Sequence, residues 1–320
     1  MTFNLYEKGV LNYLLLPLSG LFFLVSSARK KFYDLGILNS HKSNAKVIVV
    51  GNITVGGTGK TPVVITLTKY LLSRGYSVGV ISRGYGGSHH KDSYFVNENS
   101  DPAVCGDEPL LITKEAKVPV VVNKDRVQAL KDLESRHKID FIISDDGLQH
   151  YALKRDIEIT MIDESREVDN DWLLPAGPYR ESKKRLEAVD FIIYTGLSSN
   201  SQYSSYLKPT NLVNLKTNEI KPTSYFIGQN CHAVAGIGNP ERFFNTLSNC
   251  EILVTKHPFP DHYQFKEQDL VFEEEYPILM TKKDCVKCQP FATDKMWYLE
   301  VESVLSDIFY EEFSKALDVR

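Results

Sequence analysis

The chain has 320 residues, 42% of them hydrophobic, which is typical of one large or two modest globular domains. Lys and Arg number 37 and Asp and Glu 41, so the net charge of −4 does not indicate a nucleic-acid partner. Five cysteines are an odd number and fit a reducing compartment better than a disulfide framework. Cys285 and Cys288 form a lone CxxC pair. Without a second ligand pair, we interpret them as free thiols.

An apolar segment lies near the N-terminus, from Val10 to Ala28, and three basic residues at 29–31 follow it directly. Residues 1–46 carry six basic side chains against two acidic ones, a net charge of +4. A cleaved signal peptide would have its basic cluster before the apolar run. A spanning helix needs about 20 apolar residues, but this run is interrupted by Pro, Ser and Gly at positions 17–20. We predict a helix that lies in the membrane interface, with a buried core helix and a true span as alternatives.

Strand and helix patterns then alternate along the chain. The predicted strands are Lys46–Gly51, Ser77–Ser82, Val118–Val122, Asp140–Ser144, Ile157–Ile162 and Phe191–Tyr194. The predicted helices between them include Lys60–Ser73 and Arg126–Arg136. Short apolar strands separated by helices indicate an α/β fold with a parallel sheet covered by helices on both faces.

A polar region from 198 to 223, rich in Ser and Asn, is interpreted as a connection to a second, smaller α/β lobe. The elements expected in that lobe are strands at Cys231–Gly236, Glu251–Thr255, Ile278–Thr281 and Met296–Val301, and helices at Pro240–Leu247 and Val301–Leu317. We therefore expect an N-terminal membrane-associating segment over 1–45, a nucleotide-binding domain over 46–220 and a smaller domain over 221–320.

A glycine-rich loop follows the first predicted strand and precedes a helix. It reads Thr54-Val55-Gly56-Gly57-Thr58-Gly59-Lys60-Thr61. Backbone N–H groups of such a loop bind phosphates, and glycine permits their close approach. The lysine reaches the outer phosphates and the hydroxyl of Thr61 ligates Mg²⁺. The common pattern has glycine where this chain has Thr54, but the strand–loop–helix context still predicts a site for a nucleoside triphosphate.

Two adjacent acids, Asp145 and Asp146, follow the strand that ends at Ser144. An acid at the carboxyl end of a neighbouring parallel strand is where the second metal contact of a phosphate loop belongs. A strand-ending turn is the structural alternative. Together with the loop, the pair favours metal binding, and Asp146 is also a candidate catalytic residue.

Other polar groups are scattered, and no spacing rule connects them. They are Arg83, Tyr85, Asp107, Arg126, Gln149, His150, Arg180 and His262. A kinase needs a base near the acceptor hydroxyl and cations near the transferred phosphoryl group. These residues could supply both, but the pattern alone does not choose among them.

Several motifs together resemble the tetraacyldisaccharide 4′-kinases of lipid A synthesis. The motifs are Gly51-Asn52-Ile53 with the loop and Pro62, Ser82-Arg83-Gly84-Tyr85, Gly106-Asp107-Glu108-Pro109, Asp145-Asp146-Gly147-Leu148-Gln149-His150, Leu174-Pro175-Ala176-Gly177-Pro178-Tyr179-Arg180-Glu181, Phe259-Pro260-Asp261-His262-Tyr263 and Thr281-Lys282-Lys283-Asp284. They cover most of the chain in order. This family has Thr or Ser at the position of Thr54, so that departure supports the resemblance.

The resemblance implies ATP- and Mg²⁺-dependent phosphorylation of the 4′-hydroxyl of a tetraacylated glucosamine disaccharide 1-phosphate. It implies two α/β lobes with the active site between them. Asp107 matches the acid that accepts the hydroxyl proton and His262 matches its partner. Arg126 and Arg180 match positions near the transferred phosphoryl group or the 1-phosphate of the lipid. We also expect a substrate-binding group that comprises Arg83, Tyr85, Gln149 and His150.

The resemblance also implies an N-terminal helix on the cytoplasmic face of the bacterial inner membrane. A substrate with four acyl chains leaves the bilayer only at high cost, since each buried CH₂ is worth about 0.8 kcal/mol. The kinase must therefore reach the membrane surface, which favours the interfacial interpretation of the leader.

Two other functions fit parts of the sequence. A soluble kinase for a small sugar or nucleoside would not explain the apolar, basic leader. A membrane-bound ATPase or GTPase switch would explain the loop and the leader. The GTPase form usually has an Asn-Lys-x-Asp motif, and Asn123-Lys124-Asp125 lacks the spacer. We therefore expect ATP rather than GTP.

Overall fold

The computed structural model describes residues 4–88, 92–164, 168–196 and 202–319. The chain divides into two compact units, each built from separated segments. The first unit comprises Met1–Arg83, Asp125–Tyr206 and Leu305–Arg320. The second unit comprises Gly84–Lys124 and Leu207–Val304.

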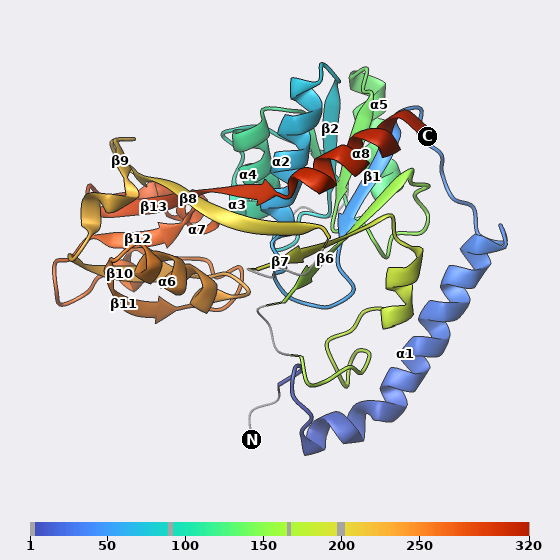
Figure 1. Ribbon diagram of the computed structural model, residues 1–320, viewed down its shortest axis with the longest axis horizontal. Helices are drawn as coiled ribbons and strands as arrows, with labels where there is room; N and C mark the ends of the chain where they lie inside the picture. The colour runs from blue at the N-terminus through green and yellow to red at the C-terminus, as the bar shows by residue number, and fades with distance from the viewer. Residues whose placement is uncertain (1–3, 89–91, 165–167, 197–201, 320) are drawn as a thin grey trace. The chain divides into compact units, whose positions relative to one another are not determined.

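Five parallel strands form the sheet of the first unit (Figure 1). In spatial order they are β7 (Phe191–Thr195), β6 (Ile157–Asp163), β1 (Lys46–Gly51), β5 (Phe141–Asp145) and β2 (Val78–Ser82). β1 is the central strand of the five, and its β-branched side chains are buried because helices cover both faces of such a sheet. Val50 pairs with Asp145 in the register of β1 and β5. The loops that follow these two strands therefore leave from the same edge of the sheet. The predicted parallel sheet is confirmed.

Helices cover this sheet. α2 (Lys60–Ser73) packs on β1, β2 and β5, and α5 (Arg126–Arg136) packs on β2. Both helices have the predicted bounds. The last helix, α8 (Asp307–Val319), places Phe309 and Phe313 against Phe191 of β7. The sequence pattern predicts that this helix starts at Val301, but residues 301–305 continue strand β13 (Met296–Leu305).

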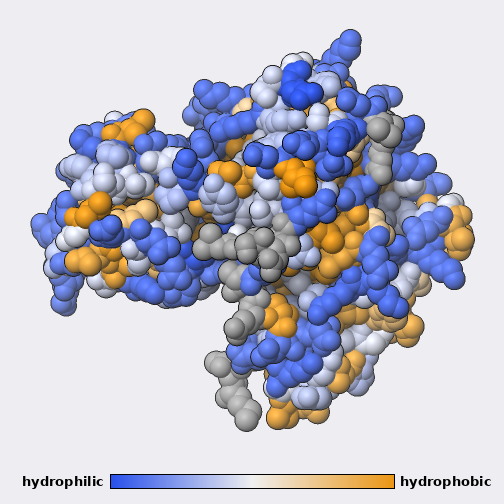
Figure 2. All heavy atoms as spheres, viewed as in Figure 1, coloured by the Kyte–Doolittle hydropathy of each residue, from blue (hydrophilic) through white to orange (hydrophobic). Residues whose placement is uncertain are grey.

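The N-terminal helix α1 (Val10–Asp34) buries polar side chains and exposes apolar ones, the reverse of a core helix. Its buried side chains are Asn12 and Ser19, whereas Leu14 is 71% and Leu24 is 65% exposed. Among the described residues, it is the one helix long and apolar enough to cross a membrane, judged by length and composition alone. The helix lies along the outside of the first unit, and Figure 2 shows apolar side chains in this region. A buried core helix is therefore wrong for this segment.

The second unit contains a further mostly parallel set of strands. In order these are β11 (Leu253–Pro258), β10 (Asn230–Ala235), β12 (Ile278–Thr281), β13 and β8 (Ser204–Asn214), with β9 (Ile220–Pro222) beside β8. β3 (Tyr94–Val96) and β4 (Val120–Val122) form an antiparallel pair. The helices are α3 (Pro102–Cys105), α4 (Asp107–Ala116), α6 (Pro240–Asn249) and α7 (Lys282–Cys288), with short 3-10 turns at Thr223–Phe226, Glu267–Leu270 and Gln289–Phe291. α4 packs on α7.

The polar region from 198 to 223 is not the irregular connection that we predicted. Residues 204–214 form β8, which is antiparallel to β9. Leu212, Val213 and Asn214 are buried at its end. Backbone pairing stabilises this strand despite its many polar side chains, and composition alone concealed it. Residues 198–201 lie outside the described residues.

Candidate active site

The glycine-rich loop connects β1 to α2, as predicted. Gly56 has φ +95° and Gly59, at the N-cap of α2, has φ +80°. Residues other than glycine rarely adopt this left-handed backbone conformation, so the loop depends on glycine at both positions. The first N–H groups of α2 have no partner within the helix and, with its dipole, favour a bound anion. The loop has the local structure of a phosphate site.

A distant segment holds the loop from outside. Val55 N–H donates to Pro178 O at 2.8 Å, and Arg180 N–H donates to Ile53 O at 2.7 Å. The hydroxyl of Tyr6, just before α1, donates to Val55 O at 2.7 Å. Residues 178–180 therefore fix both the conformation of the loop and the position of the Arg180 side chain beside it.

Three side chains form a charged cluster at this edge of the sheet. Asp146 accepts hydrogen bonds from Arg180 at 3.0 and 3.1 Å and lies 3.4 Å from Lys60 Nζ. Lys60 also donates to Asn52 Oδ1 at 3.1 Å. Burial opposes the charge of Asp146, but Lys60 and Arg180 outweigh it and lower its pKa to about 2. The cluster therefore presents two cations around an ionised carboxylate.

Asp145 and Arg126 lie deeper. Asp145 ends β5 and is 1% exposed, and Arg126, at the start of α5, is 3% exposed. Arg126 Nη2 donates to the backbone oxygen of Asp145 at 3.2 Å. Burial lowers the pKa of Arg126 to about 10, although the negative charges of Asp145 and Asp146 act to raise it. Arg126 remains charged and supports the turn that carries both acids.

The oxygen groups at this edge fit Mg²⁺. Thr61 lies in the first turn of α2, and the β1–β5 register brings Asp145 and Asp146 to the same edge. No group of three His, Cys, Asp or Glu side chains suited to a metal occurs among the described residues. Mg²⁺ usually binds through one or two carboxylates, water and substrate phosphates rather than a complete protein cage. A shared site with a nucleotide is therefore the chemistry that these residues allow.

Gln149, one of the four expected substrate-binding residues, also lies near the loop. Gln149 Nε2 donates to Asn52 O at 3.0 Å and to Glu181 at 2.9 Å. Burial and then Arg126 lower the pKa of His150 to about 4, so its imidazole is neutral. Arg83 belongs to the first unit as well and is exposed.

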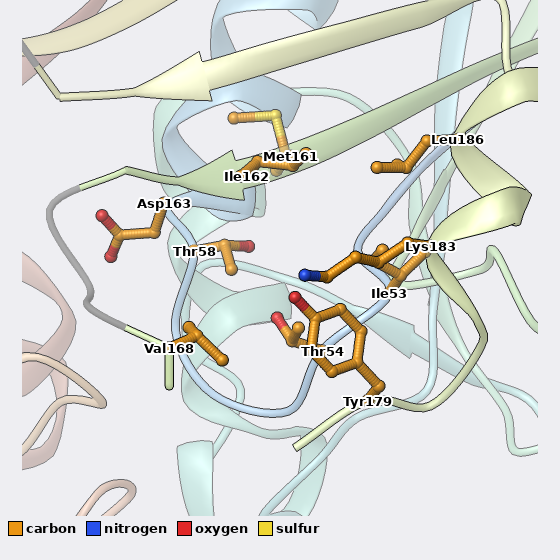
Figure 3. A pocket seen from close by; sticks show the side chains of 10 residues that line it. All are labelled: Ile53, Thr54, Thr58, Met161, Ile162, Asp163, Val168, Tyr179, Lys183 and Leu186. Carbon is orange, nitrogen blue, oxygen red and sulfur yellow. The ribbon is translucent and has the colours of Figure 1, made fainter. Parts of the chain in front are cut away.

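A cavity of about 230 Å³ adjoins the loop on the β6 side (Figure 3). Thr54 and Thr58 of the loop line it together with Met161, Tyr179 and Leu186. Asp145 and Asp146 lie on the β5 side of β1. The cavity has a mostly apolar lining, so it suits an uncharged, planar or apolar part of a ligand better than a phosphate.

The second unit contains the acid–histidine pair. Asp107 is the first residue of α4 and is 4% exposed. His262 Nδ1 donates to Asp107 Oδ1 at 3.0 Å, although 155 residues separate the two in sequence. His262 has φ +59°, a left-handed backbone that turns its ring toward α4. The predicted partnership of Asp107 with His262 is thus a direct contact in the structure.

Two lysines of α7 face the same carboxylate. Lys283 and Lys287 each lie 3.8 Å from Asp107 Oδ2, one helical turn apart. Burial opposes the charge of Asp107, but the His262 hydrogen bond and Lys283 outweigh it, so the pKa of Asp107 is lowered. Burial likewise opposes a charged His262, yet the bond to Asp107 leaves the pKa of His262 raised. Asp107 is therefore an ionised acceptor near neutral pH.

Tyr85 completes this group, since its ring lies 4.9 Å from that of His262 and is 64% exposed. The structure thus divides the predicted site residues into two sets. The first unit holds the loop, Asp145, Asp146, Arg126, Arg180, Gln149, His150 and Arg83, and the second holds Asp107, His262 and Tyr85. Sequence reasoning assigned no role to Asn52, Lys283 or Lys287. For Lys287, the one signal was its place inside the CxxC pair.

Comparison with known proteins identifies the family. The model of the family described as tetraacyldisaccharide-1-P 4′-kinase matches residues 11–318. A tetraacyldisaccharide 4′-kinase from Ruthia magnifica subsp. Calyptogena magnifica is 51% identical over 317 residues, covering 99% of both chains. One from Hahella chejuensis is 44% identical over 315 residues, covering 96% of this chain and 93% of that one.

A solved structure is similar throughout. The crystal structure of LpxK from Aquifex aeolicus in complex with ATP matches with a TM-score of 0.79 at 29% identity, covering 97% of this chain and 99% of that one. The match confirms the predicted fold class. Together with the family model and the sequence relatives, it shows that the chain belongs to the tetraacyldisaccharide-1-P 4′-kinase family.

Proposed function

We propose that this protein transfers the γ-phosphoryl group of ATP to the 4′-hydroxyl of a tetraacylated glucosamine disaccharide 1-phosphate, a step of lipid A synthesis. Family membership supports the reaction class. The observation that carries the proposal is the buried, ionised Asp107 held by His262, in a chain that also has a phosphate loop. A nucleotide-binding switch has no need for such a base.

ATP binds at the glycine-rich loop, with its phosphates on the backbone N–H groups of residues 54–61. Lys60 and Arg180, which now hold Asp146, supply positive charge to the outer phosphates. Fixed cations of this kind stabilise the charge that spreads over the phosphoryl oxygens during transfer. Mg²⁺, when bound with ATP, would neutralise further phosphate charge, and Thr61, Asp145 and Asp146 would hold it.

Asp107 accepts the proton of the acceptor hydroxyl. His262 and the backbone N–H of Glu108 occupy Oδ1, so Oδ2, although buried, is the oxygen left to accept the proton of the sugar hydroxyl. Oδ2 has no hydrogen-bond partner within the part of the chain that the structure describes. Transfer through a loose transition state forms little bond to the attacking oxygen until late, so a weakly basic but ionised carboxylate suffices.

The leader helix brings the protein to its substrate. The exposed apolar face of α1 supports an interfacial location, and the basic residues at 29–31 suit anionic headgroups. We infer the cytoplasmic face of the inner membrane as the location, because ATP is available on that side.

The decisive experiment uses the purified chain in detergent with ATP, Mg²⁺ and the disaccharide lipid. Mass spectrometry is expected to detect a lipid with one additional phosphate. ATP hydrolysis without phosphorylated lipid would instead indicate the alternative, an ATPase switch at the membrane. Phosphorylation of a water-soluble sugar or nucleoside in preference to the lipid would indicate a small-molecule kinase.

The role of Asp107 is tested separately by Asp107→Asn, which keeps the shape and removes the charge. Turnover is expected to fall about 10²-fold or more, as for loss of a general base. ATP binding, measured by calorimetry, is expected to persist because the loop belongs to the other unit. Near-normal turnover would remove Asp107 from the mechanism.

A further inference from the structure

A buried ion pair of Lys287 with Asp284 lies next to the Asp107–His262 pair in the second unit. Lys287 Nζ is 2.7 Å from Asp284 Oδ1, and the two side chains are 1% and 0% exposed. The other oxygen of Asp284 accepts hydrogen bonds from Thr281 Oγ1 at 2.6 Å and from Gly236 N–H at 3.0 Å. Asp284 is thus held rigidly, with one oxygen turned to Lys287.

Burying two charges is costly and seldom stabilises a fold more than apolar packing would. The pair therefore calls for a reason beyond stability. Lys287 has a second neighbour, because its Nζ also lies 3.8 Å from Asp107 Oδ2. The ring of Phe265 approaches the ammonium at 5.1 Å and limits its hydration. The charge of Lys287 thus acts between two carboxylates in a dry environment, where it is poorly screened.

The orientation of Asp107 is set from both sides. Oδ1 accepts from His262 at 3.0 Å and from Glu108 N–H at 3.1 Å. Oδ2 faces the two ammonium groups of α7. Lys283 differs from Lys287, because it is 16% exposed and also contacts Glu108 and Asp261. Its charge is shared and screened, whereas the ion pairs of Lys287 within the described part of the chain are those with Asp284 and Asp107.

The cysteines that flank Lys287 keep its surroundings neutral. Cys285 and Cys288 are buried free thiols. Burial raises the pKa of Cys285 to about 12 and that of Cys288 further, so both remain uncharged. No thiolate competes with Asp107 for the ammonium. The two cysteines of the CxxC pair therefore act as small, uncharged side chains that pack around a buried lysine.

We propose that Lys287, held in place by Asp284, is a positioning residue that keeps the Asp107 carboxylate ionised and fixed in its orientation beside His262. The proposal rests on the proposed role of Asp107 as the base. Lys287 acts through Asp107 and does not contact the substrate itself.

The test measures how the pH dependence of kcat responds to two variants. Asp107 is faced by His262, by Lys283 and Lys287 of α7, and by the thiol of Cys105. Loss of a cation makes Asp107 easier to protonate, so the fall of kcat on the acid side moves to higher pH. Loss of a competing anion leaves the ammonium to Asp107 alone, so this fall moves to lower pH.

The first variant, Lys287→Met with Asp284→Asn, removes both charges and leaves no isolated buried ion. We expect kcat to fall about 10-fold or more and the acid-side fall to move up by about one pH unit. KM for ATP is expected to stay within about threefold. The second variant, Asp284→Asn alone, retains Lys287 and is expected to move the acid-side fall in the opposite direction. A merely structural role would not give opposite shifts.

Lys282→Met is the matched control. Lys282 precedes Lys283 on α7 and forms ion pairs with Glu115 at 2.6 Å and Glu300 at 2.8 Å. It is a partly buried lysine of the same helix, and its two partners are not part of the site. Its loss is expected to leave the pH dependence of kcat unchanged. Circular dichroism establishes that each variant is folded, and Asp284→Asn still decides the question if the double variant does not fold.

An unchanged acid-side fall in a folded variant overturns the proposal. A further loss of kcat when the double change is added to Asp107→Asn also overturns the proposal. A residue that acts only through Asp107 has no effect on kcat once Asp107 is replaced by a neutral side chain. If the wild type phosphorylates no lipid, the proposed function fails and this inference with it. A fully active Asp107→Asn variant removes Asp107 from the mechanism, and this inference with it, but leaves the lipid kinase activity standing. An inactive Asp107→Asn beside unaltered Lys287 and Asp284 variants removes this inference alone.

Discussion

Two residues of the candidate site adopt a backbone conformation that most side chains avoid. Asp146 has φ +49° and His262 has φ +59°. Strained backbone of this kind persists where the surroundings fix it, and it clusters at functional sites. Asn tolerates the left-handed region better than Ala does. Substitution by Asn therefore separates the loss of a functional group from the loss of backbone geometry.

The Asp107–His262 pair predicts a pH-dependent stability. The pKa of His262 is raised in the folded protein, so its contribution is complete below about 6.5 and is lost as pH rises through the folded value. The pKa of Asp107 is lowered from 3.8, so its contribution is present above that value and lost as pH falls through the folded one. The pair therefore stabilises most in mildly acidic solution. We expect the difference in unfolding free energy between the wild type and His262→Asn to be larger at pH 6 than at pH 9.

Urea denaturation followed by circular dichroism measures this difference. His257→Asn is the control, because His257 belongs to the same unit and burial and His232 lower its pKa. Its protonation opposes folding, so the pH trend of its variant should have the opposite sign. A wild-type advantage over His262→Asn that grows toward alkaline pH would contradict the prediction.

Local spacing predicted the residues of the phosphate loop, because strand, glycines, lysine and helix are contiguous and their chemistry is local. It could not predict the partnership of Asp107 with His262, which are 155 residues apart. Family resemblance supplied that pairing. Lys287 was not foreseen, because only the packing of α4 on α7 brings its ammonium to Asp107.

At the scale of elements, α4 depends on the glycine before it. Gly106 has φ +91°, and a Cβ there would lie 2.8 Å from Tyr85 O. The motif around Asp107 was visible in the sequence, but the helix that it begins was not, because α4 is short and lacks a clear apolar period. The helix α7 was not visible in the sequence either, because it has only seven residues.

Gly106→Ala should therefore disturb both the fold and the position of Asp107. Left-handed strain costs about 1–3 kcal/mol, and the contact with Tyr85 O forces a backbone shift in addition. Gly228→Ala is the matched control in the same unit, since Gly228 has φ +67° but open space around its Cβ position. We expect Gly106→Ala to lose about 1 kcal/mol more than Gly228→Ala in urea denaturation. Its turnover should also fall, while that of Gly228→Ala should not.

At the scale of the whole molecule, each unit is assembled from segments far apart in the chain. Residues 84–124 join residues 207–304, and the C-terminal helix returns to the first unit. Periodicity identifies strands and helices one at a time, and so predicted the class of the fold and all five strands of the first sheet. It gives no information on which separated segments associate, because that depends on long-range packing.

α1 has two faces that differ in polarity and exposure. On its inner face, Asn12 donates to Ala176 O at 2.9 Å and Ser19 donates to Leu173 O at 2.8 Å. The segment that they hold continues to residues 178–180, which bond to the phosphate loop. On its outer face, Leu14, Leu18 and Leu21 are more than half exposed and recur at helical spacing.

These two faces should be separable by mutation. Changing Leu14, Leu18 and Leu21 to Gln removes apolar groups worth about 1.5–3 kcal/mol each in lipid, so binding to anionic vesicles should fall more than about 100-fold. ATP binding should be retained, since the inner face is intact. Asn12→Ala with Ser19→Ala should do the reverse, weakening ATP binding through the loop and leaving vesicle binding unchanged. Equal vesicle binding by the Gln variant and the wild type would show that the outer face of α1 is not the membrane contact.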